Sequence, residues 1–217
     1  MNGIYVTGTD TGVGKTFASC ALLAAWRANG LRASGMKPVA SGCEDTAQGL
    51  RNDDALALIA ASDPAPAYAD CNPFAYAPAI APHVAARLAQ QPVSLDAIVA
   101  AHARIDAQAD RVLVEGAGGW LAPFSDTLAQ ADVARALDLR VVLVVGVRLG
   151  AINHALLSAR AIRADGCALA GWIANRIDPH MPYADDTIAT IATRIDAPLL
   201  GTLAWNDAAP MLDVDAL

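Results

Sequence analysis

The sequence predicts a single domain with a doubly wound, mostly parallel α/β sheet and helices on both of its faces. Its 217 residues fit one domain of ordinary size and can bury a substantial core. Short β-type runs alternate with Ala- and Leu-rich helical segments, which is the pattern of parallel strands joined by crossover helices. The most hydrophobic run, at 140–145, is continuous rather than alternating and should form a central strand.

The strands expected from these runs span residues 4–7, 31–36, 111–115, 140–145, 169–174 and 199–203. The helices expected between them span residues 15–29, 53–61, 83–90, 95–108, 132–137, 150–165 and 182–195. Asn52 and Ser94 are suitable N-caps for two of the helices. Pro38 should end the second strand, because proline cannot donate to a ladder. Residues 39–45 are expected to be a loop, and the proline-punctuated stretch 62–82 a long irregular connection.

Composition excludes several classes of function. A formal net charge of −7 and a pI near 4.9 argue against nucleic acid as a partner. The most apolar run, 141–147, is too short to span a bilayer, and the N-terminus shows no secretory signal. The four cysteines are scattered without a C-x-x-C pair, which is typical of a reduced compartment. We therefore expect a cytoplasmic protein that binds neither nucleic acid nor membrane.

The stretch from Gly8 to Thr16 reads Gly-Thr-Asp-Thr-Gly-Val-Gly-Lys-Thr and lies between the first strand and the first helix. This context is the one that a phosphate-binding P-loop requires. Glycines let backbone N–H groups surround phosphate oxygens, and the helix directs its positive end at the same anion. Lys15 would contact the outer phosphates and Thr16 would offer a hydroxyl to Mg²⁺. The usual first glycine is displaced by one position, since Thr9 stands where it is expected.

Two carboxylates are candidates for the Mg²⁺ site beside Thr16. Glu115 ends a buried apolar strand, which is the Walker B pattern, and Asp54 lies in the first turn of a helix. Mg²⁺ takes one or two carboxylates together with phosphate oxygens. The structural alternatives are a solvent-facing acid at a strand end and an acid stabilised by the helix dipole.

Three further residues stand at expected carboxyl ends of strands, where open parallel sheets bind ligands. Lys37 is a second lysine near the phosphates, and a transfer of phosphoryl groups to an anionic acceptor would use it to neutralise charge. Ser41 could donate a hydrogen bond to a substrate, and Asn175 could recognise a base edge through its amide. Each could also be an ordinary strand-end or turn residue.

Several blocks in the same order resemble the dethiobiotin synthetase family of the biotin pathway, across residues 4 to about 205. They are 9–16 (TDTGVGKT), 37–42 (KPVASG), 50–56 (LRNDDAL), 114–119 (VEGAGG) and 145–154 (VGVRLGAINH). The resemblance implies an α/β fold of the P-loop NTPase type and an ATP-dependent ligase. In that reaction CO₂ forms a carbamate with 7,8-diaminopelargonate, ATP phosphorylates the carbamate, and the second amine closes the ring with loss of phosphate.

The resemblance also implies roles for individual residues. Lys37, Lys15 and Thr11 would be catalytic, and Thr16, Asp54 and Glu115 would bind Mg²⁺. The residues implied in binding ATP are Gly12, Val13, Gly14, Lys15, Thr16, Phe17, Asp54, Glu115, Gly116, Ala117, Gly118, Asn175, Arg176, Ala204, Trp205 and Asn206. The family is a homodimer with its substrate at the interface. Ser41 and Thr11 would contact the diamine or carbamate, and Gly150 and Asn153 of the partner helix would bind the substrate carboxylate.

The sequence departs from the family pattern at Ala81, Ala204 and Arg176, which lie in the implied substrate and adenine sites. Two other classes of P-loop protein are alternatives. Partition and cell-division ATPases carry a signature lysine four residues before Gly14, where this chain has Asp10. Amide-forming enzymes of corrin synthesis usually carry an additional glutaminase domain, for which 217 residues leave no room.

Overall fold

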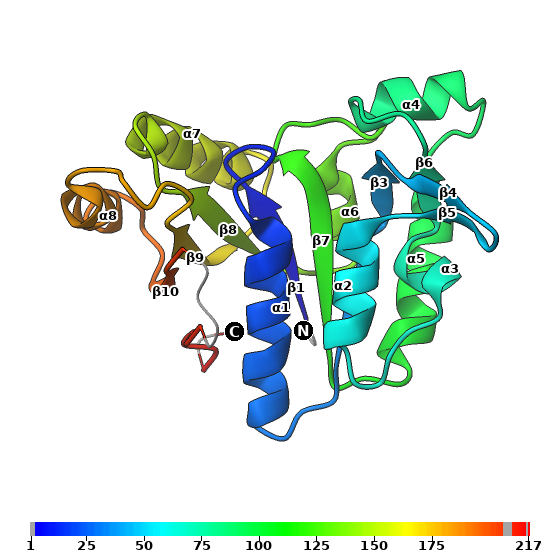
Figure 1. Cartoon of the computed structure of the whole chain (residues 1–217), viewed down its shortest axis with the longest axis horizontal. Coiled ribbons are helices and arrows are strands. Elements are labelled where there is room, and N and C mark those ends of the chain that lie inside the picture. Colours follow the sequence, from blue (N-terminus) through cyan, green and yellow to red (C-terminus); the bar gives the residue numbers. More distant parts are fainter. Residues whose placement is uncertain (1–2, 206–209, 216) are drawn as a thin grey trace.

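The computed structural model describes residues 3–205, 210–215 and 217. Within them, six parallel strands form one sheet in the order β10-β9-β8-β1-β7-β2 (Figure 1). The strands are β1 (Gly3–Gly8), β2 (Ala33–Met36), β7 (Arg111–Gly119), β8 (Arg140–Gly146), β9 (Leu169–Asn175) and β10 (Leu199–Leu203). The predicted fold class is confirmed, and β8 lies inside the sheet as expected. β7 is longer than predicted, because it continues past Glu115 through the glycines to Gly119.

Helices cover both faces of this sheet. On one face lie α1 (Lys15–Ala28), which packs on β1, and α2 (Asp53–Ala61), which packs on β2 and α1, and the core cluster of this face includes Ile4 and Val6 of β1. On the other face the cluster includes Tyr5, between those two residues, because successive side chains of a strand point to opposite faces. The helices of that second face are α5 (Leu95–Asp106), α6 (Gln130–Ala136), α7 (Ala151–Ala164) and α8 (Ala184–Ala192), whereas α4 (Pro82–Leu88) joins the same core cluster but contacts β3 and β6.

The strand order places a ligand-binding edge at β1. The chain builds β2 and β7 on one side of β1 and then β8, β9 and β10 on the other, so the direction of winding reverses there. Ligands of open α/β sheets bind outside the carboxyl ends of the strands at such a reversal. The loop from β1 to α1 and the end of β7 meet at this point (Figure 1).

Two stretches expected to be irregular contain short regular elements. The first, 39–45, contains β3 (Val39–Ser41) and most of β4 (Glu44–Thr46), which forms a hairpin with β5 (Gly49–Arg51) just beyond it. Within 62–82 lie the short helix α3 (Tyr68–Cys71) and the strand β6 (Phe74–Tyr76), which pairs with β3 in parallel. These expectations were wrong because segments of three or four residues are too short to show periodicity. The prolines also flank β6 rather than interrupt it.

The predicted helix caps are confirmed. The Asn52 side chain accepts a hydrogen bond from the Ala55 N–H, and Ser94 accepts one from the Ala97 N–H. The first cap matters for the site, because α2 carries Asp54 in its first turn. No helix in the described ranges combines the length and apolarity needed to cross a membrane.

Candidate active site

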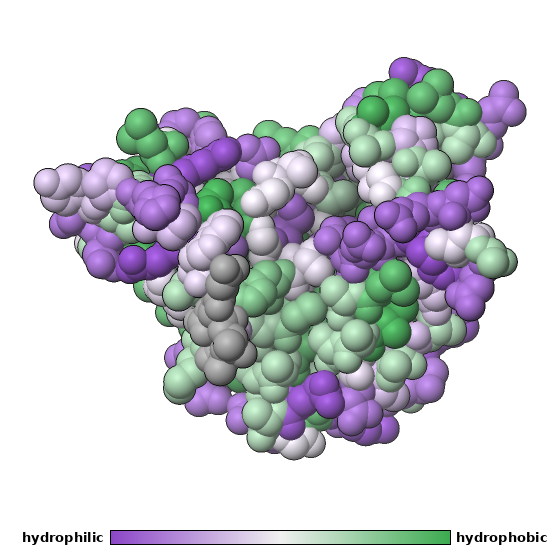
Figure 2. Space-filling model, in the orientation of Figure 1, coloured by the Kyte–Doolittle hydropathy of each residue, from purple (hydrophilic) through white to green (hydrophobic). Residues whose placement is uncertain are grey.

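A cavity of about 800 Å³ opens at the carboxyl edge of the sheet. In the space-filling view the surface is hollowed between the side that carries α7 and α8 and the side that carries α4 (Figure 2). Its walls come from the β1–α1 loop, the end of β2, the start of α2, the segment before α4 and the end of β7. The lining residues are Asp10, Thr11, Gly12, Gly14, Lys15, Thr16, Lys37, Ala40, Ser41, Asn52, Asp54, Ala79, Ile80, Ala81, Pro82, Ala117, Gly118, Gly119 and Ala122.

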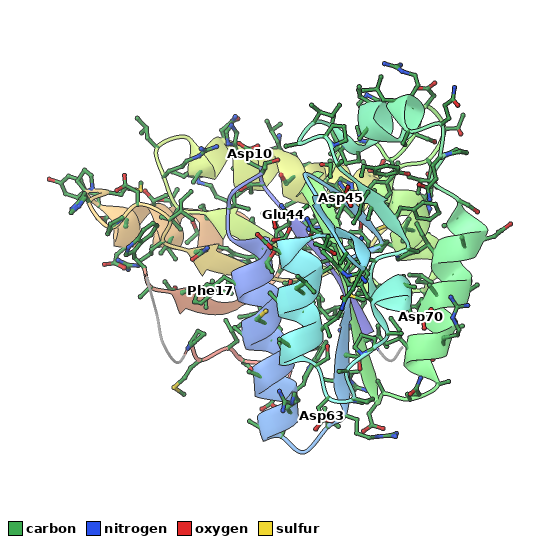
Figure 3. All side chains as sticks on the ribbon, turned by 45° about the vertical axis from the view of Figure 1, so that its right-hand side comes forward. Asp10, Phe17, Glu44, Asp45, Asp63 and Asp70 are labelled. Carbon is green, nitrogen blue, oxygen red and sulfur yellow. The ribbon has the colours of Figure 1, made fainter. Side chains whose placement is uncertain are left out.

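The loop between β1 and α1 has the backbone shape of a phosphate-binding loop. Gly12 and Gly14 have φ values of 73° and 81°, in the left-handed region that favours glycine. At Gly14 a Cβ atom would lie 2.1 Å from Nδ2 of Asn175, which donates to the Val13 carbonyl at 2.9 Å. Figure 3 shows Asp10 at the tip of this loop, above the start of α1. The Asn175 amide therefore holds the loop on the side of the sheet. On the side of the cavity, the N–H groups at the start of α1 are available to bind an anion.

Lys15 is the first residue of α1 and is buried. Its Nζ atom donates to the Asp10 carbonyl at 3.2 Å. Burial, together with the nearby charge of Lys37, lowers the pKa of Lys15 to about 8. The ammonium is thus poorly compensated in the free protein, and phosphate oxygens would supply the missing negative charge.

A cluster of charged groups lies beneath the loop. The Thr16 hydroxyl donates to Oε1 of Glu115 at 2.9 Å. The Lys37 ammonium donates to the same oxygen at 2.6 Å, to Oδ2 of Asp54 at 2.8 Å and to the Gly116 carbonyl at 3.3 Å. The side chains of Lys37 and Glu115 are 4% and 0% exposed, whereas Asp54 is 44% exposed. The three residues predicted to bind Mg²⁺ are therefore brought together, and Lys37 bridges their two carboxylates.

The charges in this cluster stabilise one another. Burial disfavours the charged form of Lys37, but Glu115 and Asp54 outweigh it, and the Lys37 pKa lies above 10.5. Burial also disfavours the charged form of Asp54, yet Lys37 outweighs it and holds the Asp54 pKa below 3.8. Oε2 of Glu115 is buried and finds no hydrogen-bond partner among the described residues. An unused carboxylate oxygen beside a second carboxylate and a hydroxyl suits a hard divalent cation, so these residues fit Mg²⁺.

The residues predicted to bind the base lie outside the cavity lining, at the ends of β9 and β10. Asn175 is 6% exposed, and its amide holds the P-loop. Arg176 donates its backbone N–H to the Leu203 carbonyl and pairs with Asp185 through its side chain. Ala204 and Trp205 follow β10 and are exposed. Asn206 lies outside the described residues, and the predicted adenine contacts stay a prediction.

The remaining predicted residues separate into two groups. Thr11, Ser41, Ala117 and Gly118 line the cavity together with Gly12 and Thr16. Val13, Glu115 and Gly116 lie behind the cavity lining, and Phe17 is 38% exposed on α1. Gly150 and Asn153 are exposed at the start of α7 and do not line this cavity. Such a position is compatible with their predicted action on a second copy of the chain.

Sequence reasoning missed two features of the site. Ala79, Ile80 and Pro82 line the cavity beside Ala81, which the resemblance had placed in the substrate site, but nothing in the sequence indicated that these neighbours would form an apolar wall. Arg148 pairs with Asp10 at 2.7 Å and so ties the β8–α7 loop to the P-loop. A lone arginine 138 residues from its partner gives no local signal.

Comparison with known proteins agrees with this geometry. A family model described as an AAA domain matches residues 2–209. An ATP-dependent dethiobiotin synthetase of Xanthomonas oryzae pv. oryzae is 57% identical over 202 residues, which cover 93% of this chain and 90% of that protein. The synthetase of Xylella fastidiosa strain 9a5c is 54% identical over 203 residues, covering 94% of this chain and 90% of the relative.

Solved structures of lower identity share the fold. The MinC:MinD cell division complex of Aquifex aeolicus matches with a TM-score of 0.57 at 14% identity, covering 94% of this chain and 81% of that chain. The cell division protein FtsY of Thermotoga maritima matches with a TM-score of 0.56 at 17% identity, covering 99% and 65%. At these identities the likeness is one of fold alone.

Proposed function

The chain belongs to the ATP-dependent dethiobiotin synthetase family, and from that premise we propose how its cavity performs the ligase reaction. The substrates are 7,8-diaminopelargonate, CO₂ and ATP, and the products are dethiobiotin, ADP and phosphate. The observation that carries the proposal is Lys37, a second buried lysine that lines the same cavity as Lys15. A hydrolase acting on ATP and water has no anionic acceptor that would require it.

The reaction divides into three steps. One amine of the diamine attacks CO₂, forms an N–C bond and loses a proton to give a carbamate. A carbamate oxygen attacks the γ-phosphorus, and the bond from that phosphorus to the bridging oxygen of ADP breaks. The second amine then attacks the carbamate carbon, and phosphate leaves as the ring closes.

The chain's residues would divide these tasks by position. The P-loop amides and Lys15 would hold the phosphates, and Lys37 would offset the charge that gathers between carbamate and γ-phosphate. Thr11 and Ser41, which line the cavity, would hydrogen-bond the acceptor. Thr16, Asp54 and Glu115 would hold Mg²⁺, which supplies a counter-charge for the transferring phosphoryl group. Lys37 would have to leave at least one of its two carboxylates to reach the acceptor.

A second copy of the chain would complete the site. Support comes from three exposed leucines: Leu149 just before α7, Leu157 on α7 and Leu121 in the segment after β7, which are 95%, 55% and 75% exposed. Leu121 and Leu157 line a hollow of about 270 Å³ together with Trp120 and His154, and we call these exposed apolar residues, with Leu149, the patch. Gly150 and Asn153 adjoin this patch in sequence. Burial of the patch would bring them to the partner's cavity, and Leu149→Glu should yield monomers by light scattering and raise the KM for the diamine.

The proposed function is tested by following carbon from labelled bicarbonate into an acid-stable product. The wild-type protein should incorporate label only when the diamine and Mg-ATP are both present. Lys37→Ala should abolish incorporation while ADP still binds in a calorimetric titration. If Lys37→Ala still incorporates label, Lys37 has no essential role in the reaction. If the wild-type protein incorporates no label, the assigned reaction is wrong.

A further inference from the structure

The wall of the cavity formed by residues 117–122 comprises the last three residues of β7 and the turn that follows them, and it contributes four lining residues. These are Ala117, Gly118, Gly119 and Ala122. β7 ends at Gly119, so the carbonyls beyond it have no ladder partner in the described sheet. Glycines add no side-chain packing that could fix their position. Gly119 pairs with Gly8, and the Ala122 N–H donates to the Gly119 carbonyl at 2.9 Å, but the rest of the wall depends on contacts from outside it.

One fully buried side chain contacts the wall at three points. Gln130, the first residue of α6, is 0% exposed. Its Nε2 atom donates to the carbonyls of Ala117, Gly119 and Ala122 at 3.0, 2.6 and 3.2 Å. Its Oε1 atom accepts from the Tyr5 hydroxyl at 3.0 Å, which fixes the orientation of the amide. A single amide thus connects both ends of the wall to the central strand of the sheet.

The Gln130 amide is closely packed on the side that faces Gly116, the residue after Glu115. A Cβ atom at Gly116 would lie 2.1 Å from Oε1 of Gln130 and 2.8 Å from the Tyr5 hydroxyl. The amide is therefore packed directly against the backbone of Gly116, whose carbonyl accepts from Lys37 at 3.3 Å. A shift of the Gln130 side chain would displace the wall and the Gly116 backbone, because the protein interior is close-packed.

The wall adjoins the early part of the P-loop rather than the start of α1. Gly119 lies beside the carbonyl oxygens of Gly8 and Thr9, and a Cβ atom at Gly118 would lie 3.5 Å from the Thr11 hydroxyl. Lys15 and Thr16, which face the phosphates, are not among these neighbours. Because Thr11 is assigned to the acceptor, we place this wall beside the acceptor, although the resemblance assigns two of its residues, Ala117 and Gly118, to ATP.

We propose that Gln130 is a positioning residue for the acceptor site, acting through the backbone of residues 117–122. This inference rests on the proposed function and deepens it, since it assigns the shape of the acceptor wall to one amide from α6. Loss of the amide removes a donor from the Ala117, Gly119 and Ala122 carbonyls, although Gly119 keeps the Ala122 N–H, and the wall loses the group that connects its two ends. Binding of the acceptor should suffer, while the phosphate site stays intact.

The test compares Gln130→Met with Tyr5→Phe in steady-state kinetics at a temperature at which both variants are folded. Methionine keeps the length of the side chain but offers no N–H, whereas Tyr5→Phe removes one hydroxyl and keeps the three contacts to the wall. Gln130→Met should raise the KM for 7,8-diaminopelargonate by ~10-fold or more and change the KM for ATP by less than about 3-fold. Tyr5→Phe loses the hydrogen bond that orients the amide but keeps the three bonds to the wall, so it should raise the KM for the diamine by less than Gln130→Met does.

The outcomes separate the possibilities. Equal losses for both substrates, or an unchanged KM for the diamine, would overturn the positioning role. If Gln130→Met does not fold, Gln130→Asn replaces it, because its shorter amide cannot reach all three carbonyls, and it must show the same selectivity. Failure of the proposed function itself would appear in the wild type, as phosphate release that does not depend on the diamine.

Discussion

Replacing Lys37 by methionine should destabilise the free protein and should make its stability depend on divalent metal. In the free chain, the Lys37 ammonium is the positive partner of both Asp54 and Glu115. Methionine keeps much of the buried stem and removes the charge. Glu115, which is 0% exposed, would then retain the Thr16 hydroxyl but lose its counter-ion.

The magnitude follows mainly from Glu115. Removing one partner of a buried ion pair typically costs about 3–5 kcal/mol, because the other charge stays buried without compensation. Asp54 adds little, since its side chain is 44% exposed and water can solvate it. In a domain of this size, about 3 kcal/mol lowers the melting temperature by roughly 6–12 °C. A metal ion that binds the released carboxylates should recover part of this loss by mass action.

Thermal melts followed by circular dichroism, with EDTA or with millimolar MgCl₂, measure this effect without any substrate. Lys15→Met is the matched control, because it removes a second buried lysine from the same cavity. Lys15 donates to a backbone carbonyl, and within the described residues no carboxylate pairs with it. Its charge is disfavoured by burial, so its removal should leave the melting temperature unchanged or raised.

Two results would refute the reasoning. One is a melting temperature for Lys37→Met in EDTA that stays close to that of the wild type. The other is an equal loss in Lys15→Met, which would mean that removal of any buried lysine stem, rather than loss of the counter-ion, lowers stability. A larger Mg²⁺-induced rise in Lys37→Met than in the wild type would support competition between the lysine and the metal for the same carboxylates.

Three further predictions concern the P-loop, a helix cap and a buried histidine. Gly14→Ala should weaken ADP binding by ~10-fold or more in calorimetry, because the new Cβ would lie 2.1 Å from the Asn175 amide. If that clash is the cause, the double variant with Asn175→Ala should recover part of the affinity. Asn52→Ala removes the cap of α2 and should cost about 1 kcal/mol in urea denaturation, whereas a cost near zero would contradict the capping role. Burial lowers the pKa of His102 below 6.5, so the unfolded chain gains a proton that the folded chain lacks, and stability should fall as pH falls through about 6.5. His102→Gln should flatten the melting temperature across that range, and an unchanged pH profile would contradict this assignment.

The sheet could be predicted from sequence because most of its strands are apolar runs separated by helices, although β2 is only four residues long. Each run carries its own evidence for a buried strand, and the P-loop shows which edge binds the ligand. The pairing of β3 with β6 could not be predicted, because Val39 and Phe74 are far apart in sequence and belong to three-residue strands. Pairing of that kind depends on tertiary contacts rather than on local pattern.

The candidate site shows the same division. The approach of Thr16, Asp54 and Glu115 followed from their positions at one sheet edge and at the helix starts beside it. The sequence did not predict that Lys37 bridges both carboxylates. A position at a strand end predicts the edge of the sheet at which a residue lies, but not the distances between its side chain and others. Asn175 lies at the predicted strand end, yet its amide nitrogen contacts the P-loop backbone. Gln130 gave no signal, because its role depends on three carbonyls that fold back toward α6.

The central claim, that this cavity transfers a phosphoryl group to a carbamate, is tested most directly by phosphate release from Mg-ATP. The purified protein is assayed with 7,8-diaminopelargonate and bicarbonate together, and then with each one omitted. The account predicts that release requires both. Equal release without them would contradict the acceptor assignment and would favour an ATP-hydrolysing switch on the same fold.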